Sequence, residues 1–556
     1  MRDNTGAGHS LKYLLVACAF ALATIVNAST ARATDYFLDS IGGDDGGDGH
    51  SDANAWRTIA PLIDTTLHAG DNVYFKRGST FNLAAAASGA DGSGLVLSMS
   101  ESGTEESRIT LSAYGTGARP IMMNDQGGDG DRIISISGGY VTVESIEFSQ
   151  AHYGAVVVEG SGHHVIVRDI ETHHLGIGVV LFGENNLVTQ NFFRDGTMVV
   201  NTPGGVDDYG ANGLVVLGSH NEISYNHAER LIAPSEDFTV DGGFCELFTA
   251  DDASITDISI HHNTVQDSDG FSEIAGNISN VVYAYNETHD NHGFATIQNT
   301  LDSDFSNILF TNNTIFESED DSSLGGSSFW FSREAESGVY TFVNNIVVQT
   351  VGGFFQRATA VTHSNNVFSG GARLGGITLG ASESSASPMF VNAAADDFHL
   401  QAGSVAINAG VAVSFTSDLD GHPVPFGGSV DIGAHEYIEP GTDAGTPLDG
   451  SVGFDAGPPP VDMGPVAADM GPPPVDAGVS VDLGISFDAG PPPPDAGPSL
   501  VDSGLATDAG RVGSGVDPVS GCSCSAAGTN PTSPLAALVA FAGVLALALR
   551  VSRKRR

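Results

Sequence analysis

The sequence predicts an all-β fold, a parallel β-solenoid in which short strands stack coil upon coil, and three observations lead to this prediction. Short alternating strands that end in Asn recur through the central region, a second short strand follows each of them, and helical periodicity is almost absent. The recurring asparagines, spaced 21 to 37 residues apart, are Asn191, Asn226, Asn263, Asn286, Asn313, Asn344 and Asn365. A β-propeller is the main alternative, but its repeat would be longer and richer in Trp, of which the chain has two.

Each recurring Asn is expected at a turn, because Asn tolerates left-handed backbone and bonds locally there. Stacked in successive coils, the amides can also bond to one another along the axis, which predicts an Asn ladder. Residues 165–169 indicate an earlier coil with Asp169 in the Asn place. The second strands are residues 177–180, 214–217, 244–247, 271–274 and 294–297.

The composition suits an exported, acidic protein. The formal net charge is −46, and Lys76 and Lys554 are the only lysines after residue 33. Nucleic-acid binding requires a basic surface, so that class of function is excluded. Cys245 is the only cysteine between residues 34 and 520, so no disulfide is expected within the body and its stability must come from packing and backbone ladders.

The chain divides into five segments. Residues 1–33 indicate a secretory signal, with Lys12 before an apolar run and small residues on both sides of a cut after Ala33; an uncleaved N-terminal anchor is the alternative. An opening segment (34–109) and the main solenoid (110–438) follow. Residues 439–520 repeat Asp, Ala, Gly and Pro, a composition that predicts a disordered, semi-rigid stalk.

The C-terminal segment, residues 521–556, predicts a membrane anchor. It contains Cys522 and Cys524, an apolar run over 535–549, and a terminal cluster of basic residues, which should stay on the cytoplasmic side. This order of features resembles the MYXO-CTERM sorting tails of bacterial surface proteins, a resemblance that implies processing and display at the cell surface. A plain single-span anchor is the alternative.

Two motifs carry a resemblance for the body. Residues 36–40, 56–59 and 70–78 form the first, and the closing motif Asp431-Ile432-Gly433-Ala434-His435-Glu436-Tyr437, preceded by residues 398–410 and 418–421, forms the second. Both resemble segments of right-handed parallel β-helix proteins of the pectate-lyase-like superfamily. The resemblance covers roughly residues 35 to 438. It implies a right-handed parallel β-helix and leaves the activity open, because the superfamily contains lyases, hydrolases, epimerases and non-catalytic surface proteins.

A candidate site follows from stacking the second strands. Alignment by their preceding glycines places Val179, Val216, Glu246, Glu273 and Thr296 in one column. Alternation turns Cys245 and Leu247 inward, so Glu246 and Glu273 should face outward. At the spacing of neighbouring coils two carboxylates repel, and one pKa should rise unless a cation lies between them.

Other polar groups are expected to converge on these glutamates. Asp269 and His292 precede the stacked glycines, and Asp241 lies nearby. Long turns at 194–212 and 228–243, the second of which contains Asp237, should form the wall of a groove. Arg230 is the nearest cation in the sequence.

Three interpretations of this patch stay open. It is a hydrolase site, with one Glu as acid and another carboxylate as base or nucleophile. Alternatively, Glu246, Glu273 and Asp241 bind calcium in a uronate lyase or epimerase, with Arg230 or Arg194 as base. In the third interpretation the glutamates form a solvated acidic face. Lys76, the only lysine of the body, is interpreted as a structural residue.

Two further predictions concern aromatic residues. Adjacent histidines in a strand should point to opposite faces, so pairs such as His261 and His262 are not expected to chelate one ion. His262 is expected to stack with Tyr225 and Tyr285. Phe244, Phe271 and Phe294 recur at one coil position and predict a packed internal stack.

The sequence thus predicts a monomeric, surface-anchored β-helix protein whose partner is an extracellular, acidic polysaccharide. It acts on that polymer as a lyase or hydrolase, with calcium as the candidate cofactor. The alternative is a non-catalytic adhesin or matrix protein, which the long stalk and the anchor would also suit.

Overall fold

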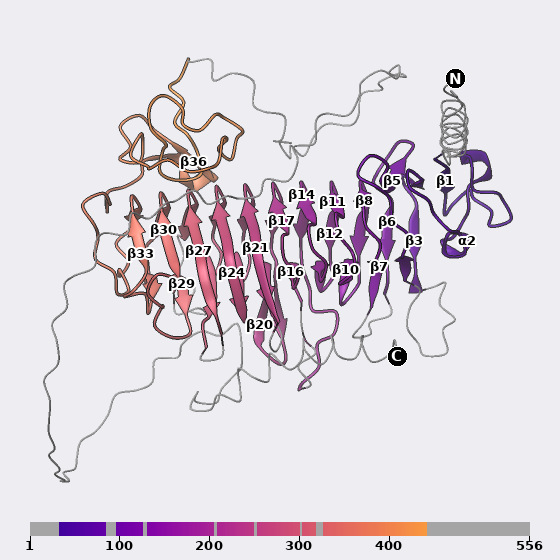
Figure 1. The fold of residues 1–556 in the computed structure, drawn as a ribbon, viewed down its shortest axis with the longest axis horizontal. Helices are drawn as coiled ribbons and strands as arrows, with labels where there is room; N and C mark the ends of the chain where they lie inside the picture. Colours follow the sequence, from indigo (N-terminus) through magenta and orange to yellow (C-terminus); the bar gives the residue numbers. More distant parts are fainter. Residues whose placement is uncertain are drawn as a thin grey trace, which may run out of the picture.

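In the computed structural model, three sheets of parallel strands wind into a β-helix (Figure 1). The structure describes residues 33–84, 96–125, 131–204, 208, 210–249, 253–300, 303–317 and 326–441. Successive strands along the chain belong to three sheets, A, B and C, in turn. Each strand pairs with the strand one coil later, as β11 (Ile166–Arg168) does with β14 (Leu187–Thr189). The parallel solenoid predicted from the Asn periodicity is therefore confirmed.

Sheet A has twelve strands and sheet B eleven. The strands of sheet A are β1 (Asp35–Leu38), β2 (Asn72–Lys76), β5 (Ile109–Tyr114), β8 (Val141–Glu144), β11 (Ile166–Arg168), β14 (Leu187–Thr189), β17 (Glu222–Ser224), β21 (Ser254–His261), β24 (Asn277–Ala284), β27 (Phe305–Thr311), β30 (Tyr340–Val343) and β33 (Thr362–Ser364). Those of sheet B are β3 (Thr80–Asn82), β6 (Ile121–Met123), β9 (Glu147–Ser149), β12 (Glu171–His173), β15 (Phe192–Arg194), β18 (His227–Glu229), β22 (Thr264–Gln266), β25 (Glu287–His289), β28 (Thr314–Glu317), β31 (Ile346–Gln349) and β34 (Val367–Ser369).

Sheet C carries the candidate site. Its strands are β4 (Leu97–Met99), β7 (Arg132–Ile136), β10 (Gly154–Val158), β13 (Ile177–Leu181), β16 (Asn212–Val216), β20 (Thr239–Phe248), β23 (Ser272–Ala275), β26 (Ala295–Gln298), β29 (Ser327–Phe331) and β32 (Gly353–Gln356). The antiparallel strand β19 (Ile232–Ser235) joins β20 as a hairpin. Helical structure among the described residues is confined to α2 (Ala60–Ile63) and two short 3₁₀ turns, η1 (Asp52–Asn54) and η4 (Ala393–Ala395).

The turn between sheets A and B contains the predicted Asn ladder. Each ladder amide donates to the side-chain oxygen of the next at 2.9–3.0 Å, through Asn191, Asn226, Asn263, Asn286, Asn313, Asn345 and Asn366. These side chains are buried, so the ladder satisfies polar groups that would be costly to leave unpaired.

Three predicted ladder positions are wrong by one residue. Asn344, Asn365 and Asp169 have φ near +50 to +60°, the left-handed residue of the turn, and the next residue points into the ladder. Asn344 and Asn365 instead donate to the Val411 and Ala409 carbonyls. Two consecutive asparagines occur at the turns 344–345 and 365–366, and both types of position favour Asn, so the pattern alone did not separate them. At the earlier turn Ile170 follows Asp169, so that coil has no ladder amide.

Two of the predictions about aromatic residues are confirmed, and one is wrong. Phe271 and Phe294 stack at 4.5 Å inside the coil, and His262 stacks between Tyr225 and Tyr285 at 4.7 and 5.3 Å. The expectation that paired histidines point apart is wrong. The Nδ1 atoms of His261 and His262 are 2.7 Å apart, because His262 has φ +55° and has already left the strand.

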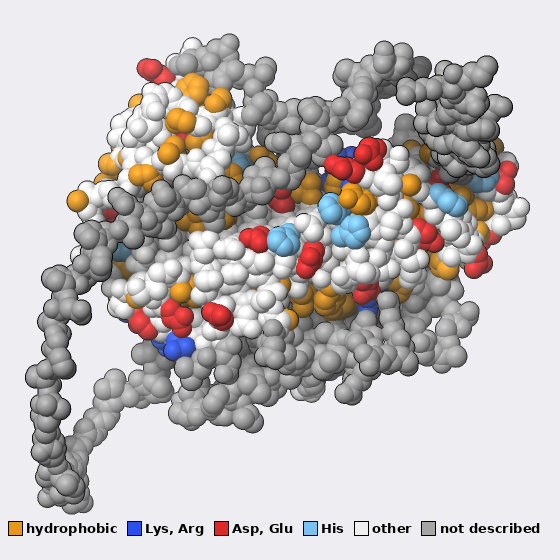
Figure 2. Space-filling view, in the orientation of Figure 1, with side chains coloured by type: hydrophobic (Ala, Val, Ile, Leu, Met, Phe, Trp, Pro, Cys, Tyr) orange, Lys and Arg blue, Asp and Glu red, His pale blue; other side chains and the backbone are white. Residues whose placement is uncertain are grey.

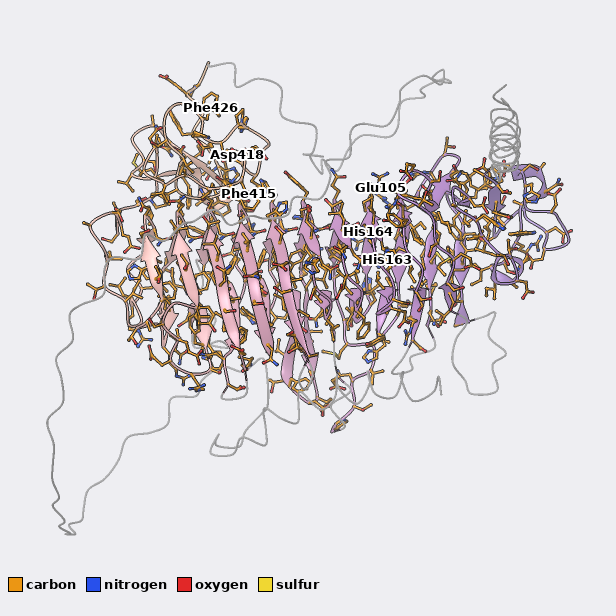
Figure 3. The ribbon with its side chains drawn as sticks, viewed as in Figure 1. Glu105, His163, His164, Phe415, Asp418 and Phe426 are labelled. Carbon is orange, nitrogen blue, oxygen red and sulfur yellow. The ribbon has the colours of Figure 1, made fainter. Side chains whose placement is uncertain are left out.

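The same ring-to-ring approach occurs at two other histidine pairs, 163–164 and 173–174. Figure 3 shows His163 and His164 on the coil, apart from the C-terminal cap that holds Phe415, Asp418 and Phe426.

The cap (residues 390–437) closes over the side of the last coils and contains a small antiparallel sheet of β35 (Phe390–Asn392) and β36 (Asp397–Leu400) (Figure 1). Val413, Phe415 and Val424 pack on the apolar side chains of Val282 and Tyr285. The cap therefore has its own apolar contact with the coil in addition to hydrogen bonds.

The opening segment belongs to the coil, since its strands pair in all three sheets. Lys76 is structural there, as predicted: its ammonium lies 3.0 Å from Asp39 and 2.7 Å from Asp52. Cys245 is buried and unpaired. Figure 2 shows scattered carboxylates and histidines and few basic side chains on the visible face.

Within the described ranges, no helix combines the length and apolar character that crossing a bilayer requires. The predicted signal, stalk and anchor, including Cys522 and Cys524, lie outside the described residues apart from the first few positions of the stalk.

Candidate functional site

The two glutamates lie side by side on the outer face of sheet C. β20 and β23 pair in parallel, with Glu246 opposite Glu273, while Cys245 and Leu247 of β20 point into the core. Side chains alternate between the faces of a strand, so both glutamates point out of the coil. The predicted pairing and orientation are confirmed.

The rest of the column differs from the alignment by glycines. Val215 precedes Glu246 in the column and Val180 precedes Val215, so Val216 and Val179 belong to the neighbouring, inward position. Thr296 follows Glu273, as predicted. The alignment failed at Val179 and Val216 because the residues opposite Gly243 in the earlier coils are Asn212 and Ile177. Gly213 therefore lies one position after the register of Gly243, and Gly176 lies one position before it.

A small, shallow cleft opens over this pair. Its lining residues are Gly242, Gly243, Cys245, Glu246, Asp269, Gly270, Ser272, Glu273 and Thr296. Gly243 and Gly270 lie next to each other in adjacent coils, and a Cβ added to Gly270 would meet only the Gly293 carbonyl oxygen, at 3.7 Å. The missing side chains leave room beside the glutamates.

Asp241 reaches this region from the β19–β20 hairpin, where it pairs with Ala233. Its carboxylate accepts a hydrogen bond from the Gly242 N–H at 2.9 Å. Burial, and then the charges of Asp269 and Glu273, raise the pKa of Asp241 well above its ordinary value. Asp241 therefore lies near the other carboxyls, as the sequence predicted, and their charges act on it.

The pKa values of both glutamates are also raised. Burial is the largest cause for Glu246, followed by Asp241 and Glu273, and the pKa rises well above the ordinary value. For Glu273 burial and the nearby Asp269 raise the pKa to about 7, against an opposing hydrogen bond from Gln298 at 3.2 Å. The site thus holds carboxyls that bind protons near neutral pH.

Asp269 and His292 form a pair at the edge of the cleft, in adjacent coils. The Nδ1 atom of His292 lies 2.7 Å from Oδ1 of Asp269, and Asp269 is almost completely buried. Each residue precedes a glycine that lies two positions before its strand, which is the position the sequence indicated.

Two predicted residues are held elsewhere. The Arg230 guanidinium pairs with Asp195 at 2.6 Å and with Glu229. Asp237 lies in the loop of the hairpin, where its carboxylate accepts from the Gly204 N–H. Neither lines the cleft, and among its described lining residues there is no lysine or arginine.

The proposed alternative base, Arg194, is also engaged, with Glu171 at 2.6 Å and Asp195 at 2.8 Å. The two long turns are joined by Asp208, a residue that the site prediction did not use. Its buried carboxylate accepts from the backbone N–H groups of Thr202, Glu236 and Asp237. Asp208 is thus a structural link that fixes the hairpin beside the cleft.

The donor chemistry of Glu246, Glu273 and Asp241 suits calcium, which prefers carboxylate oxygens, and a cation there would relieve the repulsion among these groups. The three clusters of ligand-type side chains whose atoms gather within 4.8 Å in the described part of the chain lie elsewhere, in and beside the cap. The carboxyls of the cleft are therefore not gathered into a preformed cage.

No protein-family model matches the chain, and no curated protein matches it. Among solved structures, the chain is similar to pectate lyase Pel9A, with 17% identity and a TM-score of 0.48 over 74% of this chain and 98% of that one. It is also similar to a lacto-N-biosidase from Eubacterium ramulus, with 16% identity and a TM-score of 0.43 over 63% and 67%. A Paenibacillus alginate lyase is 14% identical, with a TM-score of 0.34 over 57% and 93%. The strand pairing of this chain itself shows the β-helix.

Proposed function

We propose that the chain is an enzyme that hydrolyses glycosidic bonds of an extracellular polysaccharide in the cleft of β20 and β23. One observation carries the proposal: Glu246 and Glu273 face outward from adjacent coils at the same register, in a cleft with raised carboxyl pKa values. Glycosidases need a protonated carboxyl beside a second carboxyl, and this arrangement supplies both types of group.

The roles follow from the protonation states. Glu273, with a pKa of about 7, is suited to donate a proton to the leaving glycosidic oxygen at neutral pH. Asp269, held by His292, is placed to act as base or nucleophile. Glu246 and Asp241, whose pKa values are also raised, bind sugar hydroxyls. Whether the product retains or inverts its anomeric configuration then reports which carboxyl pair reacts.

Hydrolysis is favoured over elimination because the described residues that line the cleft include no lysine or arginine that could act as a base. A lyase of the resembled superfamily commonly uses a Lys or Arg base, whereas Arg230 and Arg194 are engaged by carboxylates outside the cleft lining. If calcium binds, Glu246, Glu273 and Asp241 would hold it, and it would neutralise the acid group of a uronate.

The predicted cellular setting belongs to the same proposal. A secretory signal, a Pro-rich stalk and a C-terminal anchor with Cys522 and Cys524 would display the β-helix outside the cell. An acidic, elongated body is suited to a long polymer that lies across several coils.

The test uses the purified full-length protein against neutral and uronate-rich polysaccharides, with and without calcium. New reducing ends without unsaturated product are the expected result. Ultraviolet absorbance from unsaturated ends would overturn hydrolysis in favour of a lyase. Binding with no product from any bound polymer would overturn the enzyme and support the adhesin.

A further inference from the structure

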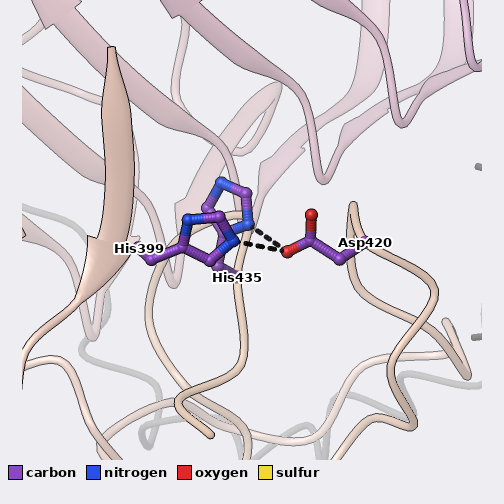
Figure 4. Close-up of side chains that lie close together, drawn as sticks. All are labelled: His399, Asp420 and His435. Atoms are coloured by element: carbon purple, nitrogen blue, oxygen red, sulfur yellow. Dashed lines mark hydrogen bonds and ion pairs between the residues drawn. The ribbon is translucent and has the colours of Figure 1, made fainter. Parts of the chain in front are cut away.

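A second cluster of ionisable side chains lies where the cap meets the coil, and the cleft does not use it. His399 comes from β36, Asp420 from a turn of the cap, and His435 from the closing motif, while Glu287 comes from β25 of the coil. Figure 4 shows the two imidazoles facing one carboxylate oxygen of Asp420. The cluster therefore joins separate parts of the chain.

Both histidines point one ring nitrogen at the same atom. Oδ2 of Asp420 lies 3.0 Å from Nε2 of His399 and 2.7 Å from Nδ1 of His435. The ring centroids are 4.3 Å apart, and the three ligand-type atoms all lie within 4.8 Å of one another. Ligand atoms around a tetrahedral zinc ion lie roughly 3–3.5 Å apart, so small side-chain shifts would admit an ion.

The second nitrogen of each imidazole, which faces away from Asp420, also has a carboxylate partner. Nδ1 of His399 lies 2.7 Å from Asp397, and Nε2 of His435 lies 2.6 Å from Glu287. Metal-binding histidines almost always donate their second N–H to a carboxylate or carbonyl, which fixes the tautomer that binds. Both imidazoles of this cluster have such a partner.

The number of N–H groups on the two imidazoles favours a bound metal ion over a cluster held by hydrogen bonds alone. If every contact were a hydrogen bond, both rings would have to donate from both nitrogens, and two imidazolium cations would share one oxygen of Asp420. A divalent ion replaces the two inner protons with the same total charge. Each neutral ring then keeps the one N–H that its outer carboxylate accepts.

We propose that His399, Asp420 and His435 form a binding site for a zinc-class divalent ion that fastens the cap to the coil. The two imidazoles select a borderline metal over calcium, which prefers oxygen. His435 is buried, whereas the His399 side chain is about half exposed, so solvent can supply a fourth ligand. Glu287 connects the ion to the coil through His435.

Two neighbouring clusters lack this arrangement. Asp418 lies beside Asp420 and His422, but its carboxylate accepts from the backbone N–H groups of His422 and Glu436, which holds the turn together. At His289, Nδ1 lies 3.3 and 3.7 Å from two carboxylates, and both contacts use that one nitrogen.

The experiment starts from full-length protein stripped with a chelator. Titration with zinc should show one tight site, with a rise in the thermal unfolding temperature, and cobalt should give the visible absorption of a four-coordinate ion. His399→Ala should lose the cobalt spectrum, at least tenfold in zinc affinity, and the thermal shift. This variant removes a half-exposed side chain, so folding should persist.

His220→Ala is the matched control, because His220 also lies by a carboxylate, at 3.3 Å, but on the open surface. It should keep all three signals. Asp397→Asn should weaken zinc binding by roughly 10- to 100-fold, the effect of losing an outer partner. The proposal is overturned if zinc does not stabilise the wild type, or if His399→Ala binds and responds as the wild type does. None of these readouts depends on the activity of the cleft.

Discussion

The cleft on sheet C and the junction between cap and coil both gather carboxylates, but they balance charge in opposite ways. In the cleft, carboxyls face one another, and burial with mutual repulsion raises the pKa values of Asp241, Glu246 and Glu273. At the junction, burial is outweighed by His435 and His399, which hold the pKa of Asp420 well below its usual range.

This difference separates a site organised for chemistry from a site organised for attachment. Carboxyls that have no nearby cation have raised pKa values, which lowers the stability of the fold. The raised pKa values also supply protonated acids, as is common at functional sites. Carboxylates that alternate with imidazoles stabilise the contact between two segments. Changes in the cleft should therefore affect turnover, and changes at the junction should affect stability.

The largest expected effect is loss of turnover from Glu273→Gln, because Glu273 is the proposed proton donor. The amide keeps the shape of the side chain but cannot exchange a proton, so kcat should fall by roughly 10²- to 10⁴-fold with the fold intact. Product formation and circular dichroism measure the two quantities. Glu184→Gln, an exposed glutamate on a turn, is the control and should change neither. Full activity in Glu273→Gln would remove this residue from the reaction.

The second effect is a pH-dependent gain in stability from Glu273→Gln. The pKa of Glu273 is about 7 in the folded chain against 4.5 in the unfolded chain, so ionisation is harder after folding. Below about pH 4.5 both states are protonated and there is no cost. As pH rises through 7, the wild type loses on the order of 3 kcal/mol that the uncharged Gln does not lose.

Denaturant unfolding of the wild type and Glu273→Gln at pH 4.5 and pH 8 measures this gain. The variant should exceed the wild type at pH 8 and match it more closely at pH 4.5. An advantage of equal size at both pH values would mean that packing, and not ionisation, causes it.

The third effect contrasts the junction with the cleft. In metal-free protein, His435→Ala leaves Asp420 and Glu287 without the ring that lies 2.7 and 2.6 Å from them. Partial exposure of both carboxylates limits the loss in unfolding free energy to about 2 kcal/mol. His220→Ala should lose less than about 0.5 kcal/mol, because its pair is exposed. Turnover in the cleft should be unchanged by either substitution.

The sequence predicted more of the cleft than of the junction, for a physical reason. Glu246, Glu273, Asp269 and His292 lie in consecutive coils, so a repeat pattern places them at one register. The junction pairs Glu287 with His435, 148 residues later, and no periodicity relates the coil to the cap. Its histidines lie in the recognised closing segment, which was the only signal present.

The errors within the coil have a similar origin. Consecutive asparagines at 344–345 and 365–366 satisfy both the left-handed position and the ladder, so composition did not choose between them. Arg230 was assigned to the cleft by proximity in sequence, but the turn directs it toward Asp195. Patterns fix the face of a regular strand better than the direction of a side chain at a turn.

The smallest expected effect concerns the binding of substrate in the cleft. Gly270→Ala adds a methyl group that meets only an ordinary contact at 3.7 Å, so the fold should tolerate it. Because Gly270 lines the cleft, the methyl should raise KM by about tenfold, or about 1.4 kcal/mol, with a smaller change in kcat.

Gly160→Ala adds the same methyl group at a turn with open space around it, and it should leave KM unchanged. Steady-state kinetics on the polymer identified by the hydrolysis assay provide the measurement for both variants. An unchanged KM in Gly270→Ala would place the bound sugar away from this glycine pair, and catalysis by Glu273 would then need a different approach of the substrate. A raised KM confined to Gly270→Ala would place the polymer across the strand starts of β20 and β23, where the unbalanced carboxyls lie.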